Sequence, residues 1–359
     1  MISSKQINNI QFCSSCYFRS IAIPPHRKAI IQITEKCNMK CKHCFVSSSS
    51  RGREITYETI QTIILPHLLK NKVNKVTLTG GEPFVHNELL KIVRLLAENN
   101  IAISICTNAS LITKEVVDEI SVYNSLHFNI SLDGFSHLSH GKFRGNEDPR
   151  AFQKIIKNIA LLGDRGLLNG ILVTPNIYSN INEYEKICIF AKEYNAKYVL
   201  MNPLSKFGRG EDSTNIAFTN TEMNKLREAT KKYCSEDFEV IYIRFPNDSK
   251  PLGECVAGQI FYIFSNGDVT ICPYMVFAAK NNNSKYTFNK FIIGNIFESD
   301  FNLQDSLNSY ILPKDSNDGK CAKCNNDKCG KGCLAAKIAN GLYLYDADED
   351  LCPFSKKLR

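Results

Sequence analysis

Three cysteines stand close together in the segment ITEKCNMKCKHCF, residues 33–45. Cys37, Cys41 and Cys44 give the spacing C-x3-C-x2-C. Thiolates are soft ligands that favour iron–sulfur clusters, zinc or copper(I), and three of them on one short loop can bind three irons of a four-iron cluster. The fourth iron would then have no protein ligand. The spacing therefore predicts a cluster with one iron open to a small ligand that chelates it through amino and carboxylate groups.

Two other interpretations of this loop stay open. A structural zinc ion usually has four protein ligands, and His43 could supply the fourth. Alternatively, the three cysteines are buried thiols that bind nothing.

The composition limits where such cysteines can act. The chain has 15 cysteines among 359 residues. Its N-terminus contains no apolar segment typical of a secretion signal, and no stretch approaches the roughly eighteen apolar residues that a membrane span requires. We therefore expect a cytoplasmic protein without a membrane partner, in which cysteines serve metal or redox chemistry rather than disulfides.

The residues around the loop alternate short apolar strands with helix-length segments, which is typical of parallel βαβ units. Ligands of such folds bind at the carboxyl ends of the strands, and the cysteine loop follows the first predicted strand. The predicted strands cover residues 29–34, 75–79, 102–107, 125–132, 168–174 and 197–202. The predicted helices cover residues 56–70, 86–99, 113–122, 150–164 and 180–194.

The cysteine loop resembles the cluster-binding signature of the radical S-adenosylmethionine (SAM) superfamily. His43 occupies the position before the third cysteine, where this family usually has an aromatic residue. The sequence Gly80-Gly81-Glu82-Pro83 resembles the family's second motif, whose backbone binds the amino group of SAM. Adjacent glycines let a backbone approach a ligand closely. The resemblance implies SAM as a cofactor, bound in part by Gly80, Gly81 and Glu82, and a [4Fe-4S] cluster on the loop.

Two later strand ends resemble elements of radical SAM peptide maturases. They are Thr107-Asn108 and Ser131-Leu132-Asp133-Gly134. Ala109 stands where the family usually has Gly, which puts the tight turn there in doubt. The resemblance implies that Asn108, Ser131 and Arg144 contact the cofactor, because an Arg fork suits its carboxylate. A solvated loop cation is the alternative interpretation of Arg144.

The cysteines resume after residue 250. Cys255, Gly267 and Cys272 give C-x11-G-x4-C, and Asn266-Gly267 lies between two β-rich segments, which predicts a hairpin. Four further cysteines have the spacing C-x2-C-x4-C-x3-C and precede a single Cys352; they are Cys321, Cys324, Cys329 and Cys333. A zinc-knuckle-like site in residues 321–333 is the structural alternative.

These seven cysteines resemble the SPASM extension of the superfamily, which binds two auxiliary iron–sulfur clusters. One interval departs from the family pattern, because four residues separate Cys324 from Cys329 where the family has five. The family's ligand order implies that auxiliary cluster I is bound by Cys255, Cys272 and Cys333. It implies that auxiliary cluster II is bound by Cys321, Cys324, Cys329 and Cys352.

Auxiliary cluster I then has only three motif ligands. Cys13, Cys16 or Cys234 could supply the fourth, or the iron could be open to substrate. We expect Cys106 and Cys188, which fall in a predicted strand and helix, to be buried structural thiols.

The resemblance implies an α/β fold with a partial (βα)6 TIM-like barrel and a C-terminal cysteine-rich SPASM domain. The expected divisions are an N-terminal extension (1–28), the radical SAM partial barrel (29–210), a bridging helix and strand (211–250) and the SPASM domain (251–359). The segment from Pro203 to Arg209 is expected to close the barrel.

The resemblance also implies the reaction, in which reductive cleavage of SAM gives a 5′-deoxyadenosyl radical that abstracts hydrogen from substrate. Because SPASM extensions are most associated with peptide maturases, the implied substrate is a ribosomally made peptide, and the product is a thioether, a C–C crosslink or a related oxidation. A sulfatase maturase that forms formylglycine is the alternative. A non-catalytic iron–sulfur electron-transfer or scaffold protein is a more distant one, since it would not need Gly80-Gly81-Glu82-Pro83.

The expected partners are a precursor peptide and a reductant such as flavodoxin or ferredoxin. Residues 1–28 are too few for a fused peptide-recognition domain, so leader binding would need a separate protein. The net charge of +8 does not indicate a nucleic-acid partner, because three bound clusters would lower it to about +4.

Overall fold

The computed structural model describes most of the chain. The described residues are 22–23, 25–247, 250–255, 257–258, 260–313, 319–321, 323–326, 328–348 and 351–353. Cys13 and Cys16 lie outside them, so their role as ligands stays a prediction.

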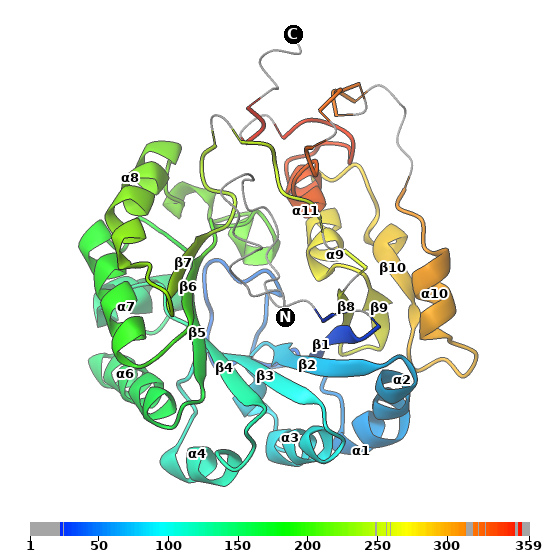
Figure 1. Cartoon of the computed structure of the whole chain (residues 1–359), viewed down its shortest axis with the longest axis horizontal. Coiled ribbons are helices and arrows are strands. Elements are labelled where there is room, and N and C mark those ends of the chain that lie inside the picture. The colour runs from blue at the N-terminus through cyan, green and yellow to red at the C-terminus, as the bar shows by residue number, and fades with distance from the viewer. Residues whose placement is uncertain are drawn as a thin grey trace.

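The strands of the described residues form one ten-stranded sheet in the order β10-β9-β8-β1-β2-β3-β4-β5-β6-β7. β1 to β7 are parallel, β8 pairs in parallel with β1, and β9 and β10 are antiparallel. In Figure 1 the parallel strands curl around a central space with helices outside, which confirms the α/β partial barrel. The strands are β1 (Arg27–Thr34), β2 (Val73–Gly80), β3 (Ala102–Thr107), β4 (Leu126–Ser131), β5 (Leu168–Val173), β6 (Tyr198–Met201), β7 (Glu239–Tyr242), β8 (Ile260–Ile263), β9 (Asp268–Thr270) and β10 (Ile292–Asn295).

The six strands predicted between residues 29 and 202 correspond to β1 to β6. The strand expected in the bridging segment is β7, which pairs with β6 and so continues the parallel sheet. The predicted hairpin at Asn266-Gly267 is confirmed, because β8 and β9 are antiparallel and Gly267 has a φ of 88°. The division of the chain at residues 28, 210 and 250 stays a prediction.

The helices of the described residues surround this sheet. They are α1 (Tyr57–Thr59), α2 (Leu65–Lys70), α3 (Leu89–Glu98), α4 (Lys114–Ile120), α5 (His137–Arg144), α6 (Pro149–Asp164), α7 (Ile181–Glu193), α8 (Asn220–Thr230), α9 (Pro273–Ala279), α10 (Leu303–Ser309) and α11 (Leu334–Ala339). A π-helical segment, Ile60–Ile64, connects α1 to α2. The five predicted helices correspond to α1 with α2, α3, α4, α6 and α7.

Helix α5 was not predicted. It begins after Ser136, whose side chain accepts a hydrogen bond from the Ser139 N–H, and ends at Gly145, whose φ of 82° suits glycine. Its last residue, Arg144, is only 7% exposed. The interpretation of Arg144 as a solvated loop cation is therefore wrong.

The strands are amphipathic across the barrel wall. In β3, Ile103 and Ile105 are buried in the main apolar core, whereas Ser104 and Cys106 line the barrel interior. Successive side chains of a strand point to opposite faces, so this alternation places apolar groups toward the helices and polar groups inside. The barrel interior therefore carries polar side chains from β3.

A second apolar core lies on the β8 side of the sheet. Helices α9 and α11 pack against each other there, and they begin directly after Cys272 and Cys333. Packing of the two helices thus brings two predicted cluster ligands to one side of the molecule. Among the helices that the structure describes, none combines the length and the hydropathy of a membrane span.

Candidate functional site

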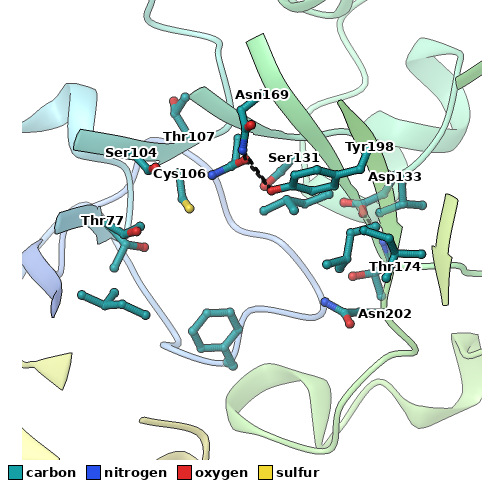
Figure 2. Close-up of a pocket in the computed structure, with 18 of the residues that line it drawn as sticks. Thr77, Ser104, Cys106, Thr107, Ser131, Asp133, Asn169, Thr174, Tyr198 and Asn202 are labelled. Carbon is teal, nitrogen blue, oxygen red and sulfur yellow. Dashed lines mark hydrogen bonds between the residues drawn. The ribbon is translucent and has the colours of Figure 1, made fainter. Parts of the chain in front are cut away.

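A cavity of about 1480 Å³ occupies the barrel interior. The thiols of Cys37, Cys41 and Cys44 line it together with residues from the carboxyl ends of several strands. Figure 2 shows side chains such as Cys106 and Ser131 projecting into this space from neighbouring strands. Pockets for one small molecule usually measure roughly 300–1,000 Å³, so the cavity can hold a cofactor and part of a second molecule.

The cysteine loop follows β1 and is folded back on itself. The Cys37 N–H donates to the Ser49 carbonyl at 2.7 Å, and the Glu35 N–H donates to the Arg53 carbonyl at 2.8 Å. The Lys42 N–H donates to the carbonyl of Phe143 in α5 at 3.0 Å. The unpredicted helix therefore helps to position the middle of the loop.

The three thiols of the loop are close neighbours. Burial raises the pKa of Cys41 to about 11; Arg144 lowers it, and Cys44 and Cys37 raise it. Burial also raises the pKa of Cys37. Thiolates, not thiols, bind metals, so loading this site releases protons. The three cysteines form no disulfide.

The two glycines of the second motif face the cysteine loop. A Cβ on Gly80 would lie 2.3 Å from the Thr34 carbonyl oxygen, and a Cβ on Gly81 would lie 2.2 Å from the Lys36 carbonyl oxygen. The Gly81 N–H donates to the Thr34 carbonyl at 2.8 Å. The glycines were predicted to let the backbone approach a ligand closely. In the structure, the backbone at these glycines lies close to the end of β1 and to the cysteine loop. Their binding of SAM stays a prediction.

Glu82 joins the end of β2 to the end of β3. Its buried carboxylate accepts hydrogen bonds from the Thr107 hydroxyl at 2.5 Å, from the Asn108 N–H at 2.8 Å and from the Phe84 N–H at 3.1 Å. Burial raises its pKa, and these hydrogen bonds oppose that shift. Glu82 therefore holds two cofactor-facing strand ends together.

Replacing Glu82 with Gln should lower the free energy of unfolding by about 1–3 kcal/mol, because an amide has one acceptor oxygen for donors on both carboxylate oxygens. Glu98→Gln is a matched control, since Glu98 is exposed at the end of α3. Thermal unfolding of both variants measures the difference. Equal midpoints for Glu82→Gln and Glu98→Gln would contradict the bridging role of Glu82.

Asn108 connects β3 to the cysteine loop. Its side-chain amide donates to Asn38 Oδ1 at 3.0 Å, and its own oxygen accepts from the Ser110 N–H at 2.9 Å. Ala109 adopts a φ of 60° and is fully buried, so the tight turn forms without the family's glycine. Asn108 and Ser131 both line the cavity, as predicted cofactor contacts should.

Arg144 forms a buried ion pair beside the cluster loop. Its Nε lies 2.6 Å from Asp133 Oδ2, and its Nη1 lies 3.9 Å from the Cys41 sulfur. Burial tends to raise the pKa of Asp133, but Arg144 and the neighbouring histidines bring it below its usual value. Asp133 also accepts from the Thr174 N–H at 2.6 Å, so α5, β4 and β5 meet at this pair.

His43 is a neutral ring in this site. Its ring stacks on Phe143 with centroids 4.3 Å apart and planes at 4°. Its Nε2 lies 3.8 Å from Asp133 Oδ2, which would favour a charged ring. Burial nevertheless lowers the pKa of His43 to about 4, so the contact is not an ion pair at neutral pH.

Arg209 holds the second half of the loop. Its Nε donates to the Cys41 carbonyl and its Nη1 donates to the Ser48 carbonyl, each at 2.8 Å. Gly208 has a φ of 52°, and a Cβ there would lie 2.7 Å from the Cys44 carbonyl oxygen. From its sequence, this segment was expected only to close the barrel. Paired Gly-Arg after the sixth strand is the one signal that could have indicated contact with the loop.

Three of the C-terminal cysteines lie near one another. Burial raises the pKa of Cys321, Lys337 lowers it, and Cys352 and Cys329 raise it, so these three cysteines are neighbours. The Gly330 N–H donates to the Leu252 carbonyl at 2.8 Å, which brings the segment before Cys255 against the segment before Cys333. The assignment of these cysteines to two auxiliary clusters stays a prediction.

Cys234 has different neighbours. Its sulfur accepts from the Val240 N–H at 3.3 Å, and it lies close enough to Cys188 to raise the pKa of that buried thiol, after burial itself. Cys188 is fully buried in α7, and Cys106 lines the barrel interior. Because Cys188 belongs to α7 and Val240 to β7, Cys234 lies beside these two elements.

The residues at the cavity fit an iron–sulfur cluster with a polar ligand beside it. Three thiols on one loop supply the soft donors. Within the described part of the chain, four buried polar atoms of cavity-lining residues have no hydrogen-bond partner: His43 Nδ1, Thr77 Oγ1, Asn202 Oδ1 and Arg209 Nη2. No three His, Cys, Asp or Glu side chains of the described residues converge on a single ion. A cluster does not require such convergence, because each iron takes its own thiolate.

Comparison with known proteins agrees with this geometry. Residues 31–190 match the profile of the Radical SAM superfamily. The chain is 26% identical to "Mycofactocin maturase MftC" of Mycolicibacterium smegmatis, over 89% of this chain and 81% of that protein. It is 27% identical to "Antilisterial bacteriocin subtilosin biosynthesis protein AlbA" of Bacillus subtilis, over 80% of this chain but only 60% of AlbA.

The fold is also found among solved structures. Streptococcus suis SuiB, crystallised with the precursor peptide SuiA, superposes with a TM-score of 0.66 over 89% of this chain and 74% of SuiB, at 20% identity. That likeness shows the fold alone. The matched profile identifies residues 31–190 as a Radical SAM superfamily domain, and that family uses SAM and a [4Fe-4S] cluster.

Proposed function

We propose that this protein is a radical SAM peptide maturase, which modifies side chains of a ribosomally made peptide. The observation that carries the proposal is the placement of the Cys37, Cys41 and Cys44 thiols on the wall of a cavity larger than one cofactor requires. Two relatives support a peptide substrate, since their names describe a maturase and a bacteriocin biosynthesis protein. The structure of SuiB with its precursor peptide agrees with the same use of this fold.

The residues of this chain bind and orient the reactants. Cys37, Cys41 and Cys44 would hold the cluster, and the ends of β2, β3 and β4 would hold SAM against it. Bound there, the two supply a 5′-deoxyadenosyl radical by reductive cleavage of SAM. The barrel wall would limit access of water to the reaction, and Asp133 with Arg144 keeps the loop and α5 in register.

We further propose two auxiliary clusters in the C-terminal region. Cys255, Cys272 and Cys333 would hold cluster I, and Cys321, Cys324, Cys329 and Cys352 would hold cluster II. The approach of Cys321 to Cys329 and Cys352 supports the second set, and the packing of α9 on α11 supports the first. A flavodoxin or ferredoxin would supply electrons, and a separate protein would recognise the leader peptide.

The fourth position of cluster I is proposed to be free of motif ligands. The contacts of Cys234 with Val240 and Cys188 place it on α7 and β7, which supports this proposal against a Cys234 ligand. Cys13 and Cys16 lie outside the described residues. An open iron would allow a substrate thiolate to bind, which favours thioether formation.

Iron analysis tests the number of clusters. Anaerobically reconstituted protein should contain about twelve irons per chain, since three four-iron clusters are proposed. Replacing Cys321, Cys324 and Cys329 with Ser should lower this to about eight, because cluster II loses three of its ligands. Zinc in place of iron, or an unchanged iron content, would contradict the assignment of cluster II.

Mass spectrometry tests the substrate class. Short open reading frames beside the gene provide candidate peptides, which are incubated anaerobically with the protein, SAM and dithionite. A peptide mass lower by about two hydrogens, with fragments that locate a crosslink, is expected from an oxidative bond-forming reaction. An aldehyde at a Cys or Ser of a sulfatase-derived peptide, without reaction of the neighbouring peptides, would instead identify a formylglycine-forming enzyme.

A further inference from the structure

A lysine side chain lies buried among the C-terminal cysteines. Lys337, in the last turn of α11, is 0% exposed. Its ammonium nitrogen lies 3.7 Å from the Cys321 sulfur and 3.0 Å from the Leu344 carbonyl oxygen. Among the residues that the structure describes, no carboxylate forms a salt bridge with Lys337. The charge is therefore enclosed with a thiol sulfur and one carbonyl as its neighbours.

Such a position is costly for a protein without a compensating anion. Removing an ammonium from water costs several kcal/mol even after relaxation, and a single carbonyl repays only part of this. A nearby pair shows the usual solution, since the Arg244 guanidinium lies 2.8 Å from the buried carboxylate of Asp348. Beside Lys337, the Cys321 sulfur stands where a carboxylate would be expected, and Cys329 and Cys352 are neighbours of Cys321.

Four thiolates around a four-iron core of about +2 carry a net charge of about −2. We propose that Lys337 is the built-in countercharge of auxiliary cluster II and sets its reduction potential through the Cys321 sulfur. A cation with a hydrogen-bond donor on a ligand sulfur favours the reduced, more negative cluster and so raises the potential. This inference rests on the proposed function, because it assumes a cluster at Cys321, Cys324, Cys329 and Cys352.

Helix α11 makes the placement rigid. It begins directly after Cys333, a proposed ligand of cluster I, and the Lys337 N–H donates to the Cys333 carbonyl at 3.4 Å. The Cys321 N–H donates to the Tyr345 carbonyl at 3.0 Å, next to the Leu344 carbonyl that binds the ammonium. The ammonium is thus fixed between the ligand segment of cluster II and the helix that leaves cluster I.

A redox titration followed by electron paramagnetic resonance tests the proposal. The titration uses the Cys37→Ala, Cys41→Ala, Cys44→Ala protein, so that only the auxiliary clusters contribute. Lys337→Met should shift one midpoint potential negative by at least 59 mV, a tenfold change in a one-electron equilibrium, and leave the other unchanged. Lys323→Met is the matched control, because it removes an exposed lysine two residues from Cys321. A shift no larger than that of Lys323→Met, with iron retained, would overturn the proposal.

If Lys337→Met loses iron, variants that keep or remove the positive charge distinguish a role of the charge from a role of side-chain shape. Retention of about eight irons by Lys337→Arg, with loss in both Lys337→Met and Lys337→Gln, would support a required cation. Loss in Lys337→Arg as well would show that shape rather than charge matters, and would overturn the proposal. Absence of iron from the Cys37→Ala, Cys41→Ala, Cys44→Ala protein itself would instead refute the auxiliary clusters of the proposed function.

Discussion

Replacing Cys37, Cys41 and Cys44 together with Ala should abolish cleavage of SAM to 5′-deoxyadenosine and methionine. The loss should exceed about 1,000-fold, because a variant without the cluster has no route for the electron that breaks the sulfonium bond. The iron content should fall at the same time from about twelve to about eight per chain. Chromatography of the nucleoside product and iron analysis measure the two effects on one preparation.

Cysteines outside the proposed ligand sets provide the control for this variant. Cys188→Ala removes a buried thiol of α7, so it should lower stability slightly but leave iron and SAM cleavage close to wild type. SAM cleavage at the wild-type rate in the triple variant would contradict the assignment of the loop. A similar loss in Cys188→Ala would show that the effect reflects folding rather than the cluster.

Replacing Arg144 with Met should lower the free energy of unfolding by about 3–5 kcal/mol, because it leaves the buried Asp133 carboxylate without its partner. The melting midpoint should fall by on the order of 10 °C. SAM binding should weaken as well, since Arg144 Nη1 lies 3.9 Å from the Cys41 sulfur and α5 contacts the loop. Thermal unfolding of the protein with and without reconstituted clusters measures the effect.

The chain offers a matched control at the surface. Arg165 lies 2.6 Å from Asp118, the same separation as Arg144 from Asp133, but both residues of this surface pair are more than a third exposed. Arg165→Met should therefore cost about 0–1 kcal/mol. Adding Asp133→Asn to Arg144→Met should restore part of the loss, because it removes the uncompensated charge. Equal effects of Arg144→Met and Arg165→Met would show that burial of the pair is unimportant.

The parallel strands could be predicted because their apolar segments are short, separated by helix-length segments and rich in β-branched residues. β1 to β6 follow that pattern, and β7 follows it more weakly in Glu239–Tyr242. The cysteine loop and Gly80-Gly81 could be predicted because their residue types and spacing allow little other chemistry. The hairpin at Asn266-Gly267 followed from turn stereochemistry.

Other features depend on contacts between distant segments, which no local pattern contains. Helix α5 has a weak apolar pattern, HLSHGKFR, and only its caps at Ser136 and Gly145 indicate it. The sequence alone does not show whether Arg144 is exposed or buried. Its burial becomes apparent only when Asp133 and Cys41 are placed around it. Arg209 and Lys337 were missed for the same reason, since each acts through atoms more than fifteen residues away.

The central claim is that SAM binds the iron left open by Cys37, Cys41 and Cys44. Electron paramagnetic resonance of the reduced protein, recorded before and after addition of SAM, tests it most directly. We expect SAM to change the signal of one cluster in the wild type, because a new ligand alters the open iron. The Cys37→Ala, Cys41→Ala, Cys44→Ala protein should show only the auxiliary signals, unchanged by SAM. A wild-type spectrum that SAM leaves unchanged, or a SAM-dependent change that persists in the triple variant, would contradict the claim.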